Sequence, residues 1–464
     1  MNSQQQAKFH LGFIWAALGI AIFAGFAIGA HLAAVIGLDR PLGPGFFSYI
    51  QLHGHLQLVG WAGLFIIGIS LHFIPRLAGI PLASSQWLPR IQVLLTTGLV
   101  MRAVFHSILP YLSAPAVLHT SAILVAMSGL LEWAGITGYV VLILNSIRRS
   151  RQAVKARPAL QAVQPYFAMM LAGWMIYATL NLILLVAMAI DGVATLNQAW
   201  NDFAINLFCG LVLLPVAFAF STRMFPLYLR LRAADWPVGN VGLIYLSFFL
   251  LQLLPTLPPW LNMMPQAGLL ISASGQCGKA VVIFFFVWKI DVLLRRRAPW
   301  TVERIGEPGP ERKPTRAGLP DYGEFGRFER LLYAAYIWLL IGAGLELLTG
   351  LATLWQWEIG ISTDAIRHCY LLGFITLLIL GMAPRMIPGF INKNLASVKL
   401  VNRTFWYGNF AVVCRVLPLL VPDFLLEKFS SAVFISQAMF TLSGVFGLAA
   451  ISYLAVNLRR TAKA

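Results

Sequence analysis

Charged residues are scarce in this sequence. Asp, Glu, Lys and Arg make up 11% of the 464 residues, hydrophobic residues make up 59%, and the mean hydropathy is +0.77. A chain so poor in charge cannot supply the polar surface that a soluble domain of this size requires. The composition excludes an ordinary soluble protein and predicts an integral membrane protein.

Closely spaced cysteine pairs are missing as well. The four cysteines (Cys209, Cys277, Cys369 and Cys414) form no CxxC pair and no CxxCH sequence. This excludes a covalently attached c-type haem and gives no basis for a disulfide framework. The first apolar segment is too long, and too poorly matched to a cleavage pattern, to be a removable signal peptide.

What the sequence has instead is a series of long apolar segments. About 20 apolar residues suffice to cross the hydrocarbon core of a bilayer as a helix. Twelve segments reach this length and predict an all-α membrane protein: 12–37, 54–75, 89–109, 117–147, 165–190, 203–226, 239–258, 265–292, 330–355, 365–386, 402–421 and 429–456.

Basic residues set the expected orientation. Most of the 34 Lys and Arg residues lie in the loops on the side of the N-terminus, which the positive-inside rule places in the cytoplasm. We expect a multi-pass protein of a bacterial inner membrane with both termini cytoplasmic and a cytoplasmic linker at 293–329. The net charge of +17 then reflects topology, and no nucleic-acid partner is expected.

An internal repeat divides the chain. Residues 55, 58, 60, 68 and 75 recur, identical in type, 313 positions later as His368, Leu371, Gly373, Gly381 and Pro388. A fainter copy ends at Pro226 and has Asn206 at the histidine position. The pattern predicts one membrane domain, 1–464, made of three parallel four-helix pseudo-repeats at about 1–155, 156–328 and 329–464.

Histidines begin two of the repeated segments and are candidate haem ligands. His53 and His55 are two positions apart, so they point to roughly opposite sides of a helix. We expect His55 and His368, which occupy equivalent positions, to hold one haem iron, and His53 to hold a second haem or copper. His106 and His119 are candidate copper ligands across a short turn. The alternative for each is a hydrogen-bonded interfacial histidine.

Buried charges accompany the histidines. Arg102 and Arg415 share the 313-residue offset, and haem propionates would suit them because guanidinium binds carboxylates in a bidentate manner. The alternatives are pairing with Glu132 or another protein group, and reaching outward to the interface. Glu132 and Glu346 are candidate proton-relay or metal-ligand carboxylates, or else neutral hydrogen-bonded acids.

His53-Gly-His55 with Gly60, Gly68 and Pro75, and His368-Cys-Tyr-Leu-Leu-Gly373 with Gly381 and Arg385, resemble the NnrS family. Members of that family are membrane haem and copper proteins associated with nitric oxide stress in bacteria. The resemblance covers essentially the whole chain and implies ligand roles for His53, His55 and His368. It departs from the family at Leu56-Gln57, where a glutamate often follows the second histidine.

The three-fold layout and His55-Leu-Gln-Leu-Val-Gly-Trp61 also look like the wider haem–copper oxidase and nitric oxide reductase superfamily. Here residues 156–328 contain no histidine, and Asn206 stands where a ligand would be expected. A standard binuclear oxygen-reducing centre is therefore not expected. The resemblances imply one or two b-type haems, possible copper, and a haem-dependent oxidoreductase that acts on nitric oxide.

Two other functions stay open on the sequence. The chain could be a haem subunit that passes electrons from a quinol or to and from a cytochrome, without substrate chemistry of its own. It could also be a haem or metal transporter with transient histidine ligands, although parallel repeats are not the inverted repeats common in transporters. A haem with both axial positions filled transfers electrons, whereas one with an open position can bind nitric oxide.

Overall fold

The computed structural model describes residues 9–153, 158–297 and 323–464, and within these ranges the chain forms helices and no strands. Most of the expected linker, 293–329, lies outside the described residues. Among the described residues, eleven helical segments are long and apolar enough to cross a membrane. They are Gly12–Gly37, Phe46–Ala78, Trp87–Tyr111, Pro115–Arg149, Gln164–Asp191, Gln198–Leu229, Val238–Thr256, Pro265–Ile290, Phe328–Trp355, Thr363–Phe390 and Ser430–Lys463.

The twelfth expected segment, 402–421, is helical but more polar than the others. It corresponds to α17 (Val398–Val416) and a 3-10 turn, η7 (Leu417–Leu420). Lys399, Arg403 and Arg415 lie along α17, which explains why it is not among the eleven. The helix still packs against α16 (Leu377–Phe390) and α19 (Ser430–Lys463), so it belongs to the bundle.

Three helices, one from each repeat, form the centre of the bundle. In the most apolar window of each, 89%, 78% and 83% of the residues are buried, against 33–50% in the other eight spans. These inner helices are α3–η2–α4 (Phe46–Ala78), α9–η4–α10 (Gln198–Leu229) and α15–η6–α16 (Thr363–Phe390). The remaining helices surround them and face the lipid with their exposed apolar side chains.

The inner helices share a local irregularity. Each contains a π-helical segment at the same repeat position: η2 (Leu56–Gly63), η4 (Phe208–Leu213) and η6 (Cys369–Thr376). Segments of this kind arise from an extra residue in an α-helix and are frequent near functional sites. Their presence in all three inner helices confirms the parallel three-fold repeat, including its faint second copy.

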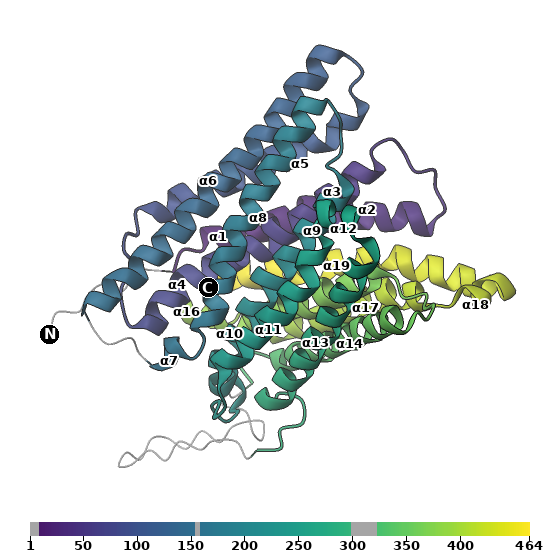
Figure 1. Cartoon of the computed structure of the whole chain (residues 1–464). Coiled ribbons are helices and arrows are strands. Elements are labelled where there is room, and N and C mark those ends of the chain that lie inside the picture. Colours follow the sequence, from purple (N-terminus) through teal and green to yellow (C-terminus); the bar gives the residue numbers. More distant parts are fainter. Residues whose placement is uncertain (1–8, 154–157, 298–322) are drawn as a thin grey trace, which may run out of the picture.

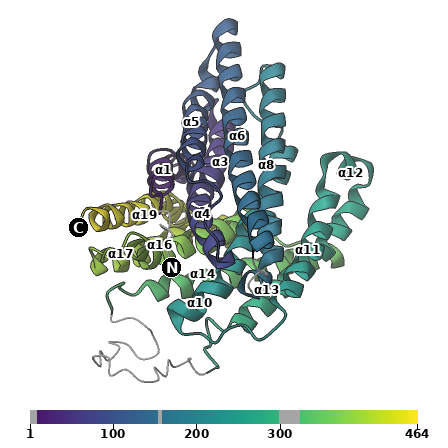
Figure 2. The same cartoon turned by 90° about the vertical axis from the view of Figure 1, so that its left-hand side faces the viewer.

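The repeats meet at three junctions. The first meets the second where α6 (Pro115–Ala153) packs on α8 (Gln164–Asp191), and the second meets the third where α13 (Pro265–Ile290) packs on α14 (Phe328–Trp355). The third closes on the first through α19 and α2 (Phe26–Gly37). Figure 1 shows this closure, with the yellow end of the chain beside its purple beginning. In the view of Figure 2, α6 and α8 again run side by side.

Small residues allow the helices to approach closely. A Cβ atom on Gly60 would lie 2.4 Å from Ile20, and one on the equivalent Gly373 would lie 2.7 Å from Trp338. Helices in a bilayer associate largely through such close packing, because lipid and apolar side chains are equally hydrophobic. These two glycines therefore allow the inner helices of the first and third repeats to lie close against the first helix of their own repeat.

Candidate functional site

Charged and histidine side chains gather in three groups, one at each junction between repeats. The 3–1 cavity is lined by His53, Asp364, His368 and Arg415 among others. The 1–2 cluster consists of His55, Arg102, His106, Glu132 and Tyr177, and the 2–3 cluster of Gln252, Lys279, Glu346 and Tyr370. Each group combines residues from two neighbouring repeats.

The 3–1 cavity is a hollow that opens beside His53 and His368. Its volume is about 440 Å³, which lies in the usual range for cofactor and ligand sites. α2, α3, α15, α17, η7 and α19 contribute its walls. Most of the lining is apolar, and the residues concerned are Leu32, Ile36, Gly37, Ile50, Pro418, Leu419 and Phe440.

His53 and His368 line this cavity with their rings held in a similar way. The Nδ1 atom of His53 lies 2.8 Å from the carbonyl oxygen of Gly25, and Nδ1 of His368 lies 2.8 Å from that of Asp364. A carbonyl can only accept, so both rings donate from Nδ1 and keep the Nε2 lone pair for another partner. Histidines that bind metals are usually oriented by such a bond from the second nitrogen.

Arg415 supplies the positive charge of the cavity. Its Nε atom donates to Nε2 of His368 at 3.2 Å, and one terminal nitrogen donates to the Asp364 carboxylate at 2.9 Å. The guanidinium also lies over the ring of Phe440, 4.1 Å from its centre. The sequence predicted Arg415 as a polar anchor but missed Asp364, whose signal was its position one turn before His368.

The donor set of the 3–1 cavity fits a haem. Two imidazole Nε2 atoms are suitable axial ligands, the apolar walls suit a macrocycle, and Arg415 suits a propionate. His53 and His368 line the same cavity from α3 and α15. The residues present are therefore compatible with a bis-histidine haem between α3 and α15.

His55 lies on the other side of α3, in the 1–2 cluster. Its Nε2 is 2.7 Å from a carboxylate oxygen of Glu132, and its Nδ1 is 3.0 Å from the hydroxyl of Tyr177. The structure does not bring His55 and His368 to one site, which corrects the expected pairing. Because His55 and His368 occupy equivalent repeat positions, each points into the junction between its own repeat and the next one. For His55 this is the junction of the first repeat with the second, and for His368 it is the junction of the third with the first.

Arg102 and His106 form the other half of the 1–2 cluster. Arg102 is completely buried and donates from Nε to Nδ1 of His106 at 3.1 Å, while His106 donates from Nε2 to the carbonyl of Ala194 at 3.1 Å. His119 is exposed on α6, so the expected copper pair of His106 and His119 does not converge. Among the described residues, no group of three His, Cys, Asp or Glu side chains could hold a metal ion.

The 2–3 cluster has a buried ion pair and no histidine. Lys279 donates to Glu346 at 2.7 Å, and Gln252 donates to the same carboxylate oxygen at 2.9 Å. The hydroxyl of Tyr370 donates to the other oxygen at 2.6 Å. Glu346, expected as a relay or ligand, is here saturated by three donors, so the cluster joins the second repeat to the third.

Replacing Lys279 with methionine is expected to destabilise the protein by about 3–5 kcal/mol, because Glu346 would be left as a buried charge without its cation. The double variant Lys279→Met, Glu346→Gln should recover most of this loss, since the neutral amide no longer needs a counter-charge. Thermal unfolding in detergent measures both. Equal stability of the single variant and the unmodified protein would contradict the assignment.

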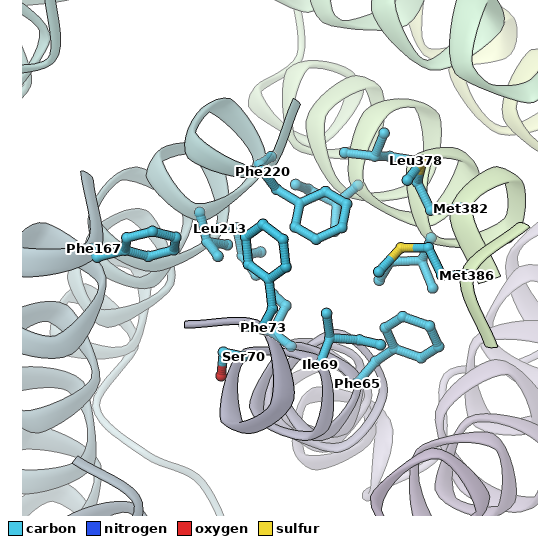
Figure 3. Close-up of a pocket in the computed structure, with 15 residues that line it drawn as sticks. Phe65, Ile69, Ser70, Phe73, Phe167, Leu213, Phe220, Leu378, Met382 and Met386 are labelled. Carbon is cyan, nitrogen blue, oxygen red and sulfur yellow. The ribbon is translucent and has the colours of Figure 1, made fainter. Parts of the chain in front are cut away.

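A second cavity, of about 70 Å³, lies between the inner helices of all three repeats (Figure 3). Phe65, Phe73, Phe220 and Met386 face one another across it. Ser70 is the one polar side chain among the described residues that line it, and its hydroxyl already contacts the Ile67 carbonyl and the Tyr139 hydroxyl. This cavity offers little to a polar ligand, and its only soft ligand atoms are the thioether sulfurs of Met382 and Met386 among the described residues.

Comparison with known proteins identifies the fold of the chain but assigns it to no family. No family model matches the chain, and no curated protein matches it. Among solved structures 32 chains match. One, described as a heme-copper terminal oxidase dimer studied by cryo-EM, is 13% identical with a TM-score of 0.57, and the match covers 98% of this chain and 83% of that one.

This likeness confirms the predicted fold class and the distant similarity to the haem–copper oxidase superfamily at the level of fold. Together with the eleven spans it identifies the chain as a multi-pass membrane protein. Membership of the NnrS family, the orientation of the loops and the bacterial inner membrane stay predictions.

Proposed function

We propose that the chain is a membrane haem protein that takes part in nitric oxide metabolism, with one haem in the 3–1 cavity. The observation that supports this most strongly is the pair of histidines in one cavity, each fixed through Nδ1. Nε2 of His53 is left for a metal, and Nε2 of His368 would exchange its contact with Arg415 for one. Bound haem would supply one-electron chemistry at its iron. A quinol or a cytochrome is the expected electron donor.

The residues of the cavity have separable tasks in this proposal. Gly25 and Asp364 fix the rotation of the two imidazoles through their carbonyl groups. Arg415 would donate to a propionate, and its own charge is balanced by Asp364. Apolar side chains such as Leu32, Ile36 and Phe440 flank these polar groups.

The role in nitric oxide metabolism rests on the resemblance carried by His53-Gly-His55 and His368-Cys-Tyr-Leu-Leu-Gly373. It is tested by a reduced-minus-oxidised absorption spectrum of the purified protein, recorded with and without nitric oxide, alongside metal analysis for iron and copper. Haem bands that shift on adding nitric oxide support the proposal. A protein without haem would remove it.

A second candidate is an electron-transfer subunit without substrate chemistry. It is favoured by the presence of two histidines in one cavity, because they would fill both axial positions of the iron. Haem bands that are reducible but do not respond to nitric oxide would select this function.

Gly29 makes room for the ring of His53, and its replacement by alanine tests the site. A Cβ atom at position 29 would lie 2.5 Å from Cε1 of His53, so the ring would have to turn and release the Gly25 carbonyl. Changes to groups that orient a metal ligand typically cost about 10–100-fold in metal affinity. We expect a loss of that size in haem affinity for Gly29→Ala.

Gly19→Ala is the matched control on the same membrane span, because nothing lies within 4 Å of a Cβ atom there. It should retain haem. Equal haem affinity of the two variants, measured by titrating the haem-free proteins, would argue against a ligand role for His53.

A further inference from the structure

The two arginines at equivalent repeat positions differ in one respect. One terminal nitrogen of Arg415 holds the carboxylate of Asp364 in the 3–1 cavity. Both terminal nitrogens of Arg102, in the 1–2 cluster, have no hydrogen-bond partner within the described part of the chain, although the side chain is completely buried. A buried guanidinium without such partners is among the costliest arrangements in a protein, and more so in a membrane.

The unpaired donors of Arg102 are accompanied by further polar groups. Glu132 lies within electrostatic range of Arg102 but does not hydrogen-bond to it. One oxygen of Glu132 contacts His55, and the other has no partner among the described residues. Tyr177 and Glu132 engage the two nitrogens of His55, so this ring offers Arg102 no acceptor. The terminal nitrogens of Arg102 are thus left for a ligand.

The repeat indicates which chemistry would complete the cluster. At the equivalent position the guanidinium binds a carboxylate, and two adjacent unpaired N–H groups match the two oxygens of a carboxylate or another planar oxyanion. Nε of Arg102 donates to His106, which is itself held by the Ala194 carbonyl, and this contact fixes the direction of the outer nitrogens of Arg102.

We propose that the 1–2 cluster is a second binding site, which takes a carboxylate or a small planar oxyanion on the terminal nitrogens of Arg102. This site lies in a different junction from the 3–1 cavity and does not depend on the haem proposed there. The oxyanion could belong to a free ion such as formate or nitrite. It could also be the propionate of a second haem.

The test uses the purified full-length protein and sodium formate or sodium nitrite, with sodium chloride as the ionic-strength control. Binding is followed by the rise in the thermal unfolding temperature. Arg102→Lys keeps the charge but removes the two-pronged geometry, and should weaken binding about tenfold or more, the effect of losing one charge-assisted hydrogen bond. Arg415→Lys, at the same repeat position in another junction, should keep the response.

Isotope-edited infrared spectroscopy of ¹³C-formate on the unmodified protein serves as the measurement that needs no variant. A bound formate should show a shifted carboxylate band that excess nitrite removes. No shifted band and no rise in unfolding temperature, together with a haem content that Arg102→Lys leaves unchanged, would overturn the proposal, and so would an equal anion response in Arg102→Lys.

The number of haems per chain, measured on the same samples, separates the two sources. Two haems in the unmodified protein and one in Arg102→Lys would assign the oxyanion to a propionate. An unchanged haem number with a lost anion response would assign it to a free ion. An Arg102-dependent anion response in a protein that binds no haem would support this site and remove the proposed function.

Discussion

Replacing either His53 or His368 with alanine is expected to remove most bound haem, whereas His55→Ala is expected to retain it. His53 and His368 share the 3–1 cavity, while His55 points into the 1–2 cluster and contacts Glu132 and Tyr177. An axial imidazole is a main attachment of a non-covalent haem, so its loss should reduce haem content several-fold or more. Haem is quantified against protein by absorbance in alkaline pyridine.

His55→Ala is a demanding control for this experiment, because it lies two residues from His53 on the same helix and carries the same risk of poor membrane insertion. It should lower stability by about 1–3 kcal/mol, since a buried oxygen of Glu132 loses its partner. Haem retained in His53→Ala and lost in His55→Ala would restore the pairing of His55 with His368 that the sequence suggested.

The second large effect is expected at the contact between α2 and α19. A Cβ atom on Gly444 would lie 2.4 Å from the Cα atom of Ala30, so Gly444→Val must push the two helices apart. Both helices form walls of the 3–1 cavity. We expect a loss of stability at or above the 1–3 kcal/mol typical of overpacked cores, together with a loss of haem. Thermal unfolding and haem content measure the two effects.

Gly447→Ala provides the comparison, less than one turn further along α19. Its Cβ atom would meet the ring of Phe26 at 3.1 Å, and a side chain can move where a backbone cannot. This variant should keep its haem and most of its stability. Similar behaviour of Gly444→Val and Gly447→Ala would show that the close approach of α2 and α19 does not shape the cavity.

The fold could be predicted from the sequence because its two signals, the apolar spans and the internal repeat, are visible in the sequence itself. Each span is recognisable by its own apolar length, and the constant 313-residue offset relates the first repeat to the third without knowledge of contacts. The exception was 402–421, where Arg403 and Arg415 make α17 too polar to qualify by composition. α17 packs against α16 and α19, and these contacts, which the sequence does not show, place it in the bundle.

The pairing of the histidines could not be predicted from the sequence, because it depends on which junction each side of an inner helix faces. The sequence showed that His53 and His55 point in opposite directions, but not that a rotation of the repeat separates His55 from His368. Asp364 and Tyr177 were missed for the same reason, since their roles arise from contacts with His368 and His55 across one turn and across a junction. Arg102 and Arg415 were found because their charge is conspicuous in an apolar span.

The three inner helices have the same number of residues between the histidine or asparagine position and the later proline, and a π-helical segment lies in each interval. Twenty residues separate His55 from Pro75, Asn206 from Pro226, and His368 from Pro388, and each interval contains one π-helical segment. Deleting a single residue there would convert π turns to α turns and rotate the histidine by about 100° relative to the rest of the helix. One deletion in Leu56–Gly63 would thus turn His53 and His55 together out of the junctions that they now face, without altering either side chain.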